Sequence, residues 1–236
     1  MDANSRINTE STEILDRVRG HRCGPAGGRL LDGPLAGAGG VAVVDGLPDP
    51  GTTAALLREA MALYPDAEAQ IVDRHDGATG RGGIPDRRLR TSGGGPVQDA
   101  FYTAPWISDF LSSVCGAPVV PTGGRGSYSF YVEEGDYLGL HLDIDACDVT
   151  LITVLRDDAP PGDPSGGLLV HPGHLGASLH EVRGLPDPAG GLVRAAPGQS
   201  IVLLGGLLPH ETVPVNADHP RIISALCFRA EGPTGA

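Results

Sequence analysis

The chain contains no lysine: its 17 basic residues are all arginine, against 29 acidic residues, and the formal net charge is −12. This excess of acid leaves no dominant basic face, which argues against nucleic acid or an anionic membrane as partner. Alanine, glycine and proline are common, and with arginine replacing lysine the composition is typical of GC-rich bacterial genes. No apolar run could span a bilayer, and the N-terminus lacks the apolar segment of a secretory signal. We therefore expect a cytoplasmic protein.

Cysteine is also scarce. The four cysteines, Cys23, Cys115, Cys147 and Cys227, are far apart and form no CxxC pair. This spacing argues against a zinc ribbon or a disulfide framework, so reduced thiols are expected.

Glycine and proline, with 36 and 21 residues, favour many turns and short strands over a helical bundle. A length of 236 residues suits a single domain. We predict a mainly β protein in which residues 1–124 give helical support and a lid region, and residues 125–230 form a compact β core.

The N-terminal half predicts helices and one strand. A short helix is expected within residues 9–19, a strand in "GVAVVDGLPDP", and an amphipathic helix over 51–64, with Thr52 or Thr53 near its cap. A further helix is expected over 99–116, with these side chains packed inward: Phe101, Trp106, Ile107, Phe110 and Leu111. Residues 73–97 carry five arginines among seven glycines without periodicity. This segment is consistent with a solvated loop and equally with a functional lid.

From residue 125 on, short apolar runs alternate with turns, which predicts a sandwich or small barrel. The predicted strands are "SYSFYVE", "DYLGLHLD", "DVTLITVL", "GGLLVHP", "GLVRAA", "SIVLLGG", "HETVPV" and "RIISALCF".

Three potential metal ligands lie on these strands. Side chains alternate across a strand, so His141 and Asp143 in "LHLD" point to one face and could clamp a metal. Taken alone, H-x-D more often marks a salt-bridged surface pair, but His210 opens another strand after a buried one. Two histidines and a carboxylate form the facial triad of non-haem iron oxygenases. Arg221 begins an apolar strand and needs an anionic partner there.

With these motifs, residues 128–229 resemble the double-stranded β-helix core of the Fe(II)/2-oxoglutarate-dependent oxygenases, in particular the prolyl-hydroxylase-like branch. The resemblance implies a jelly-roll fold in which His141, Asp143 and His210 bind iron. It also implies that Arg221 holds the C5 carboxylate of the cosubstrate 2-oxoglutarate. Tyr131 matches a tyrosine that reaches the same carboxylate in related enzymes, but it also fits a core aromatic on the first barrel strand.

The sequence departs from the family pattern at two places. Some branches have a serine two residues after the arginine, where this chain has Ile223, and Ser224 should face the other way. Many relatives have Asn at the position of Arg156, which could leave Arg156 free for substrate. The arginines of 73–97 and Arg125 are further candidates for a substrate carboxylate.

Other histidines and acids fit less well as ligands. The turn after the ligand strand should carry Asp145 away from a metal. His171 and His174 flank a Pro-Gly turn, and this favours a solvated loop.

The implied reaction uses Fe(II), O2 and 2-oxoglutarate, with ascorbate as reductant in vitro, and releases succinate and CO2 while a C–H bond is hydroxylated. Related halogenases have Gly or Ala where this chain has Asp143, so hydroxylation is expected, with desaturation or ring closure left open. The expected substrate is a small molecule, either an amino acid or a natural-product intermediate. Two alternatives remain: a cupin-like dioxygenase or isomerase without 2-oxoglutarate, and a non-catalytic sensor that binds 2-oxoglutarate or metal.

Overall fold

The computed structural model describes residues 29–73, 77–185 and 190–231. Within these residues twelve strands form one antiparallel sheet with the order β1-β10-β7-β12-β5-β3-β6-β11-β8-β9, while β2 pairs with β3 and β4 pairs with β12. The strands are β1 (Val41–Val44), β2 (Glu68–Val72), β3 (Arg87–Gly93), β4 (Val119–Pro121), β5 (Ser127–Tyr131), β6 (Tyr137–His141), β7 (Val149–Asp157), β8 (Leu168–Val170), β9 (Gly191–Val193), β10 (Ser200–Leu203), β11 (His210–Thr212) and β12 (Arg221–Ala230).

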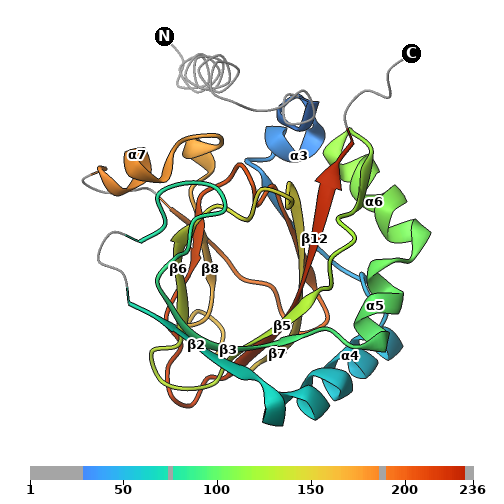
Figure 1. The fold of residues 1–236 in the computed structure, drawn as a ribbon, viewed down its shortest axis with the longest axis vertical. Helices are drawn as coiled ribbons and strands as arrows, with labels where there is room; N and C mark the ends of the chain where they lie inside the picture. The colour runs from blue at the N-terminus through green and yellow to red at the C-terminus, as the bar shows by residue number, and fades with distance from the viewer. Residues whose placement is uncertain (1–28, 74–76, 186–189, 232–236) are drawn as a thin grey trace.

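The sheet curls on itself, so that β6 and β8 lie opposite β5, β7 and β12 (Figure 1). The two sides enclose a shared interior, because one cavity is lined by residues of β6, β8 and β11 and by residues of β5, β7 and β12. This is the predicted double-stranded β-helix, and all eight strands expected after residue 125 are confirmed.

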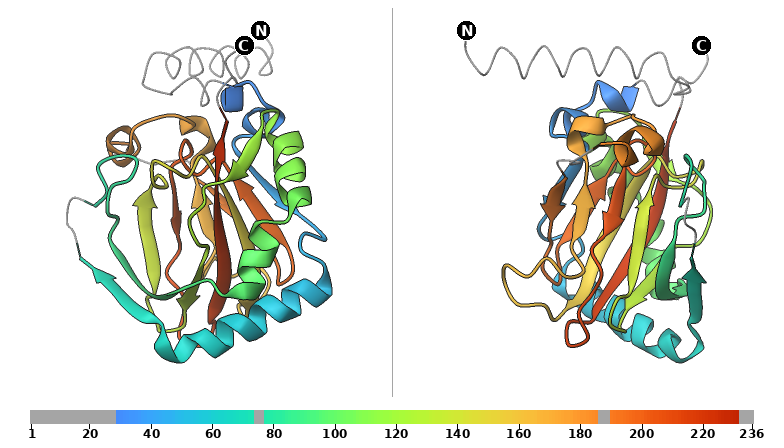
Figure 2. Two further views of the ribbon diagram at one scale, coloured as in Figure 1. Left: turned by 45° about the vertical axis from the view of Figure 1, so that its right-hand side comes forward. Right: turned by 90° about the vertical axis from the view of Figure 1, so that its left-hand side faces the viewer.

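Three helices cover the outside of the β5, β7 and β12 side (Figures 1 and 2): α4 (Pro50–Leu63), α5 (Pro96–Tyr102) and α6 (Pro105–Cys115). Two short helices, α3 (Pro34–Gly37) and α7 (Leu179–Arg183), lie at the end of the barrel that is uppermost in Figure 1. There are also two short 3-10 turns, η1 (Tyr64–Asp66) and η2 (Pro172–His174). The predicted strand β1 and helix α4 are confirmed, whereas the helix predicted within 9–19 lies outside the described residues. The cap of α4 is Asp49, whose carboxylate accepts hydrogen bonds from the amides of Gly51 and Thr52.

One glutamate ties the helical layer to the barrel. Glu59 of α4 accepts hydrogen bonds from the amides of Val97 and Gln98, at 2.7 and 2.9 Å, and from the hydroxyl of Tyr128 on β5, at 2.7 Å. The fully buried side chain of Gln98 in turn donates to the hydroxyl of Ser224 on β12 at 2.7 Å. These bonds fix α4 and α5 against the outer face of the strands that carry the cavity.

The helix predicted over 99–116 is two helices. Pro105 occupies the first turn of α6, and a proline forces the preceding residue out of the helical region, so Ala104 has φ −64° and ψ 123°. Because α6 starts anew at Pro105, its side chains face other directions than they would in one continuous helix. Trp106 is therefore 48% exposed and not packed inward, although its ring contacts Phe101 edge-on with centroids 5.9 Å apart.

The segment 73–97 contains a strand, which the sequence did not predict. Strand β3 has one buried side chain, Leu89, so it lacks the alternation that marks a half-buried strand. Two of its arginines have partners outside the cavity: Arg88 pairs with Glu133 at 3.2 Å, and Arg90 donates to the carbonyl of Ala67 at 3.3 Å.

The prediction of reduced thiols is wrong for one pair, because Cys147 and Cys227 form a disulfide across 80 residues of sequence. Strand pairing brings them together: β7 follows Cys147 directly, and Cys227 of β12 lies opposite Thr150 of β7. Sequence spacing cannot show such a contact. Cys115 is a free, buried thiol.

Among the helices of the described ranges, none has both the length and the apolar character needed to cross a lipid bilayer.

Candidate metal centre

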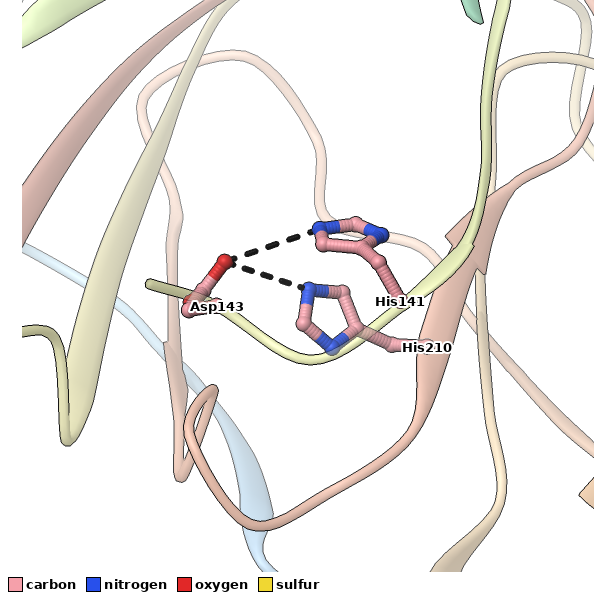
Figure 3. A group of neighbouring side chains, drawn as sticks. All are labelled: His141, Asp143 and His210. Carbon is pink, nitrogen blue, oxygen red and sulfur yellow. Dashed lines mark ion pairs between the residues drawn. The ribbon is translucent and has the colours of Figure 1, made fainter. Parts of the chain in front are cut away.

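The two predicted histidine ligands lie side by side in the barrel. His210 on β11 is paired in register with His141 on β6, and their ring centroids are 4.2 Å apart. Asp143 follows β6 by two residues, and its Oδ1 lies 3.5 Å from Nε2 of His141 and 3.8 Å from Nε2 of His210 (Figure 3). Their potential ligand atoms all lie within 4.8 Å of one another, at a cavity of about 90 Å³.

Both histidines are held in one tautomer. Nδ1 of His141 donates to the carbonyl of Gly139 and Nδ1 of His210 donates to the carbonyl of Leu208, each at 2.8 Å. A histidine that gives its Nδ1 proton to a backbone carbonyl keeps the Nε2 lone pair for a metal. Burial, helped by the neighbouring His141, lowers the pKa of His210 to about 4, so this ring is neutral near pH 7.

The carboxylate of Asp143 is kept ionised. Burial opposes its charge, but the nearby imidazoles of His141 and His210 and a hydrogen bond from Thr150 hold its pKa well below the usual range. The amide of Asp143 donates to the carbonyl of Gly205 at 2.9 Å, which fixes the residue's backbone. Two imidazole nitrogens and one anionic oxygen therefore converge on one point.

This donor set suits a divalent transition metal. Imidazole nitrogen with one carboxylate is the ligand combination of non-haem iron sites, and three ligands on one side leave positions for other molecules. No other group of three or more histidine, cysteine or acidic side chains in the described part of the chain has a comparable geometry.

Gly205 makes room for the aspartate. A Cβ atom at this residue would lie 1.9 Å from Oδ2 of Asp143 and 2.5 Å from Oγ1 of Thr150. We expect Gly205→Ala to displace the carboxylate and to weaken metal binding by about 10–100-fold, as loss of a ligand's supporting contacts does. Titration of Fe(II) or Mn(II) by calorimetry would measure this. Gly173→Ala is the matched control, since its Cβ would meet nothing within 4 Å, and an unaltered affinity in Gly205→Ala would contradict the geometry.

Arg221 and Tyr131 line the same cavity as the three ligands. They are directly paired on β12 and β5, and both are nearly fully buried. The hydroxyl of Tyr131 lies 3.5 Å from Oγ1 of Thr212, and burial raises its pKa. Tyr131 is thus a core aromatic that also faces the cavity, so its two predicted roles are compatible.

The sequence predicted an anionic partner for Arg221, and one such partner is a residue of the chain itself. Nη1 of Arg221 pairs with Oδ2 of Asp157 at 2.6 Å, and Asp157 lies opposite Arg221 at the end of β7. The sequence reasoning missed Asp157, because only the register of β7 against β12 identifies it. Ile223 lines the cavity, whereas Ser224 points to the outer face, as predicted.

Two other charged residues near the motif, Asp145 and Arg156, lie outside the cavity. Asp145 is 88% exposed, in agreement with its predicted place in a turn. Arg156 is 45% exposed and its Nε donates to Asp158 at 2.9 Å, so it is bound outside the cavity rather than free within it.

Part of segment 73–97 packs against the ligand loop. The amide of Gly82 donates to the carbonyl of Asp143 at 3.3 Å, and Arg81 pairs with Asp148 at 2.7 Å. Ala78 is 1% exposed and packs with Leu142 and Leu179. Residues 77 and 78 are therefore buried and not solvated, and a lid function stays a prediction.

His171 also differs from expectation. It is 1% exposed and not solvated, with Nε2 3.9 Å from Oε1 of Glu211, and burial lowers its pKa. The residue sits directly after β8, where its amide donates to the carbonyl of Pro209. The Pro-Gly turn that suggested solvent begins after it.

Comparison with models of known protein families and with curated protein sequences gives no match. Solved structures do match. The non-haem α-ketoglutarate-dependent epimerase SnoN from nogalamycin biosynthesis superposes with a TM-score of 0.63 at 17% identity, covering 84% of each chain. A prolyl-4-hydroxylase from Pseudomonas putida gives 0.55 at 18% identity, covering 84% of this chain and 100% of its own. EctD from S. alaskensis with 2-oxoglutarate and 5-hydroxyectoine gives 0.56 at 18% identity, covering 81% of this chain and 72% of its own. At these identities the likeness confirms the fold that the sequence resemblance implied.

Proposed function

We propose that the protein is an Fe(II)- and 2-oxoglutarate-dependent oxygenase that hydroxylates a C–H bond of a small molecule. One observation carries the proposal: a single barrel cavity is lined by the convergent His141, Asp143 and His210 and also by the buried Arg221. A metal ligand set and a cation in one cavity suit a cosubstrate that chelates metal at one end and carries a carboxylate at the other.

Each residue has a defined part in this proposal. His141, Asp143 and His210 hold iron, and bound iron with 2-oxoglutarate supplies the oxidising chemistry, with release of succinate and CO2. Arg221 binds the distal carboxylate and Tyr131 packs beside it. Gly139, Leu208, Thr150 and Gly205 keep the ligands in place. The protein's remaining task is to place one substrate C–H bond next to the metal.

The structural neighbours support the same cofactors. SnoN has been crystallised with Fe3+, α-ketoglutarate and nogalamycin RO, and EctD with bound Fe and with 2-oxoglutarate and 5-hydroxyectoine. Both ligand sets include a small molecule, which supports an amino acid or natural-product intermediate as substrate here. The presence of Asp143 favours hydroxylation over halogenation. A cytoplasmic location remains part of the proposal.

The test is release of succinate from 2-oxoglutarate with Fe(II) and ascorbate, run against a panel of free amino acids and natural-product acids. Mass spectrometry of the product separates a gain of one oxygen from desaturation and from epimerisation. Metal-dependent turnover without any use of 2-oxoglutarate would favour the cupin-like alternative, and binding of 2-oxoglutarate without turnover of any substrate would favour a sensor.

The two aspartates of "HLDID" should respond differently to substitution. We expect Asp143→Ala to reduce succinate release to background, because one of three ligands is lost. Asp145→Ala should retain iron binding and most of the activity, since its side chain is 88% exposed. Iron titration and succinate release measured on both variants decide this. The reverse pattern would show that the ligand strand has another register.

A further inference from the structure

Three charged side chains meet at the Arg221 side of the cavity. The carboxylate of Asp157 lies between two guanidinium groups: Oδ2 is 2.6 Å from Nη1 of Arg221, and Oδ1 is 2.6 Å from Nη2 of Arg194. The side chains of Asp157 and Arg221 are 5% and 4% exposed, and that of Arg194 is 21% exposed. Each carboxylate oxygen thus accepts from a different arginine.

The arrangement has a simple charge balance. Arg221 and Asp157 alone would form a neutral buried pair, with the carboxylate of Asp157 close to any anion that approaches Arg221. Repulsion between like charges is strong where water is excluded. With Arg194 included, the three groups carry one net positive charge.

The position of Arg194 is fixed by bonds other than the ion pair. It follows β9, and its Nη1 donates to the carbonyls of Asp163 and Ser165, at 2.5 and 2.7 Å, in the connection between β7 and β8. That connection continues into Gly166, whose Cα is so close to Arg221 that an added Cβ would lie 3.1 Å from Cδ of Arg221. Arg194 therefore binds Oδ1 of Asp157 while Arg221 binds Oδ2.

We propose that Arg194 is a positioning residue that neutralises Asp157 and so leaves Arg221 with an unmatched positive charge for the distal carboxylate of the cosubstrate. The proposal rests on the proposed function, because it specifies how 2-oxoglutarate is bound there. It assigns a role in cosubstrate affinity to two residues, Asp157 and Arg194, that no part of the iron motif includes.

A purely structural role for Arg194 predicts a different result for the double substitution. If Arg194 served only to anchor the β7–β8 connection through its two carbonyl contacts, then removing the charge of Asp157 would not repair the loss of Arg194. If the role is charge balance, removing both charges leaves Arg221 with its full positive charge, and binding returns. A double substitution therefore separates the two.

The experiment uses Arg194→Gln, Arg194→Lys and the double variant D157N/R194Q, with Arg156→Gln as matched control because Arg156 is ion-paired outside the cavity. The first readout is the rise in melting temperature that 2-oxoglutarate causes in Mn(II)-loaded protein, which reports binding without turnover. The second is the split between KM for 2-oxoglutarate and kcat in the iron enzyme.

We expect R194Q to weaken 2-oxoglutarate binding about tenfold or more, with kcat retained, as loss of a buried charge partner does. R194K and D157N/R194Q should stay within about threefold of wild type. A double variant as weak as R194Q, or an R194Q protein with wild-type affinity, would overturn the proposal. Should R194Q melt below the assay temperature, its affinity for 2-oxoglutarate is measured by calorimetry at a temperature below its melting point, beside wild type and the double variant.

Failure of the proposed function has a distinct signature. Wild-type protein that gains no melting temperature from 2-oxoglutarate and releases no succinate would overturn both proposals together. Wild-type protein that binds 2-oxoglutarate, with R194Q unaltered, would overturn only the role of Arg194.

Discussion

Replacing His210 with alanine is expected to abolish Fe(II)-dependent succinate release and to remove high-affinity metal binding. Loss of a contact that only supports a ligand costs about 10–100-fold in metal affinity, so loss of the ligand itself should exceed a hundredfold. His210 is neutral in the fold, because burial lowers its pKa to about 4, and its removal leaves no uncompensated charge. What it does leave is the carbonyl of Leu208 without its donor, at a cost of about 1–3 kcal/mol. The barrel should therefore remain folded.

The measurement pairs metal titration with thermal unfolding. In wild type, Mn(II) should raise the melting temperature, and in His210→Ala this rise should vanish while the metal-free melting temperature falls only moderately. His219→Ala is a suitable control, since this histidine lies beyond β11 and its Nδ1 is 3.1 Å from a carboxylate oxygen of Asp163, outside the metal centre. Normal turnover in His210→Ala would refute the assignment of the metal centre.

Sequence could predict the strands that show either alternation or a continuous apolar run. In β5 the buried Tyr128 and Phe130 alternate with less buried residues, whereas every residue of β10 is buried. Strands β2 and β3 have no such pattern, because they lie at the surface and expose arginine and glutamate. The break between α5 and α6 was readable in principle from Pro105, whose effect on Ala104 is local.

The candidate site shows a similar division. The sequence identified His141, Asp143 and His210 because each is a polar residue within or next to an apolar, strand-like stretch. That is a local signal. Asp157 and Gly205 were missed because their importance comes from strand register and from close approach, both of which are non-local.

The disulfide and the charge cluster have the same origin. Cys147 meets Cys227, and Arg194 meets Asp157, only because β7 pairs with β12 and β8 with β9. A single sequence contains no signal for such contacts. Once the strand register is known, it identifies residues such as Asp157 and Arg194, which we propose affect cosubstrate binding although they do not belong to the iron-binding motif.

Arg221→Ala is expected to raise the 2-oxoglutarate requirement by orders of magnitude while iron affinity stays nearly unchanged. A carboxylate buried without its partner costs about 3–5 kcal/mol, which corresponds to roughly a hundredfold to several thousandfold. Iron affinity should be spared because the ion pair of Arg221 is with Asp157 and not with Asp143. Asp157 keeps Arg194 as a partner, so the variant does not leave a bare buried anion.

Arg221→Lys should fall between wild type and Arg221→Ala, because lysine keeps the charge but cannot donate to Asp157 and to a ligand carboxylate with one planar group. Titration of 2-oxoglutarate against succinate release in the three proteins, with Mn(II) affinity measured in parallel, checks both parts. The half-exposed Arg156 is bound by Asp158 on the outside, so it is a poor substitute anchor. An unchanged 2-oxoglutarate requirement in Arg221→Ala would show that Arg221 is not the anchor of the cosubstrate.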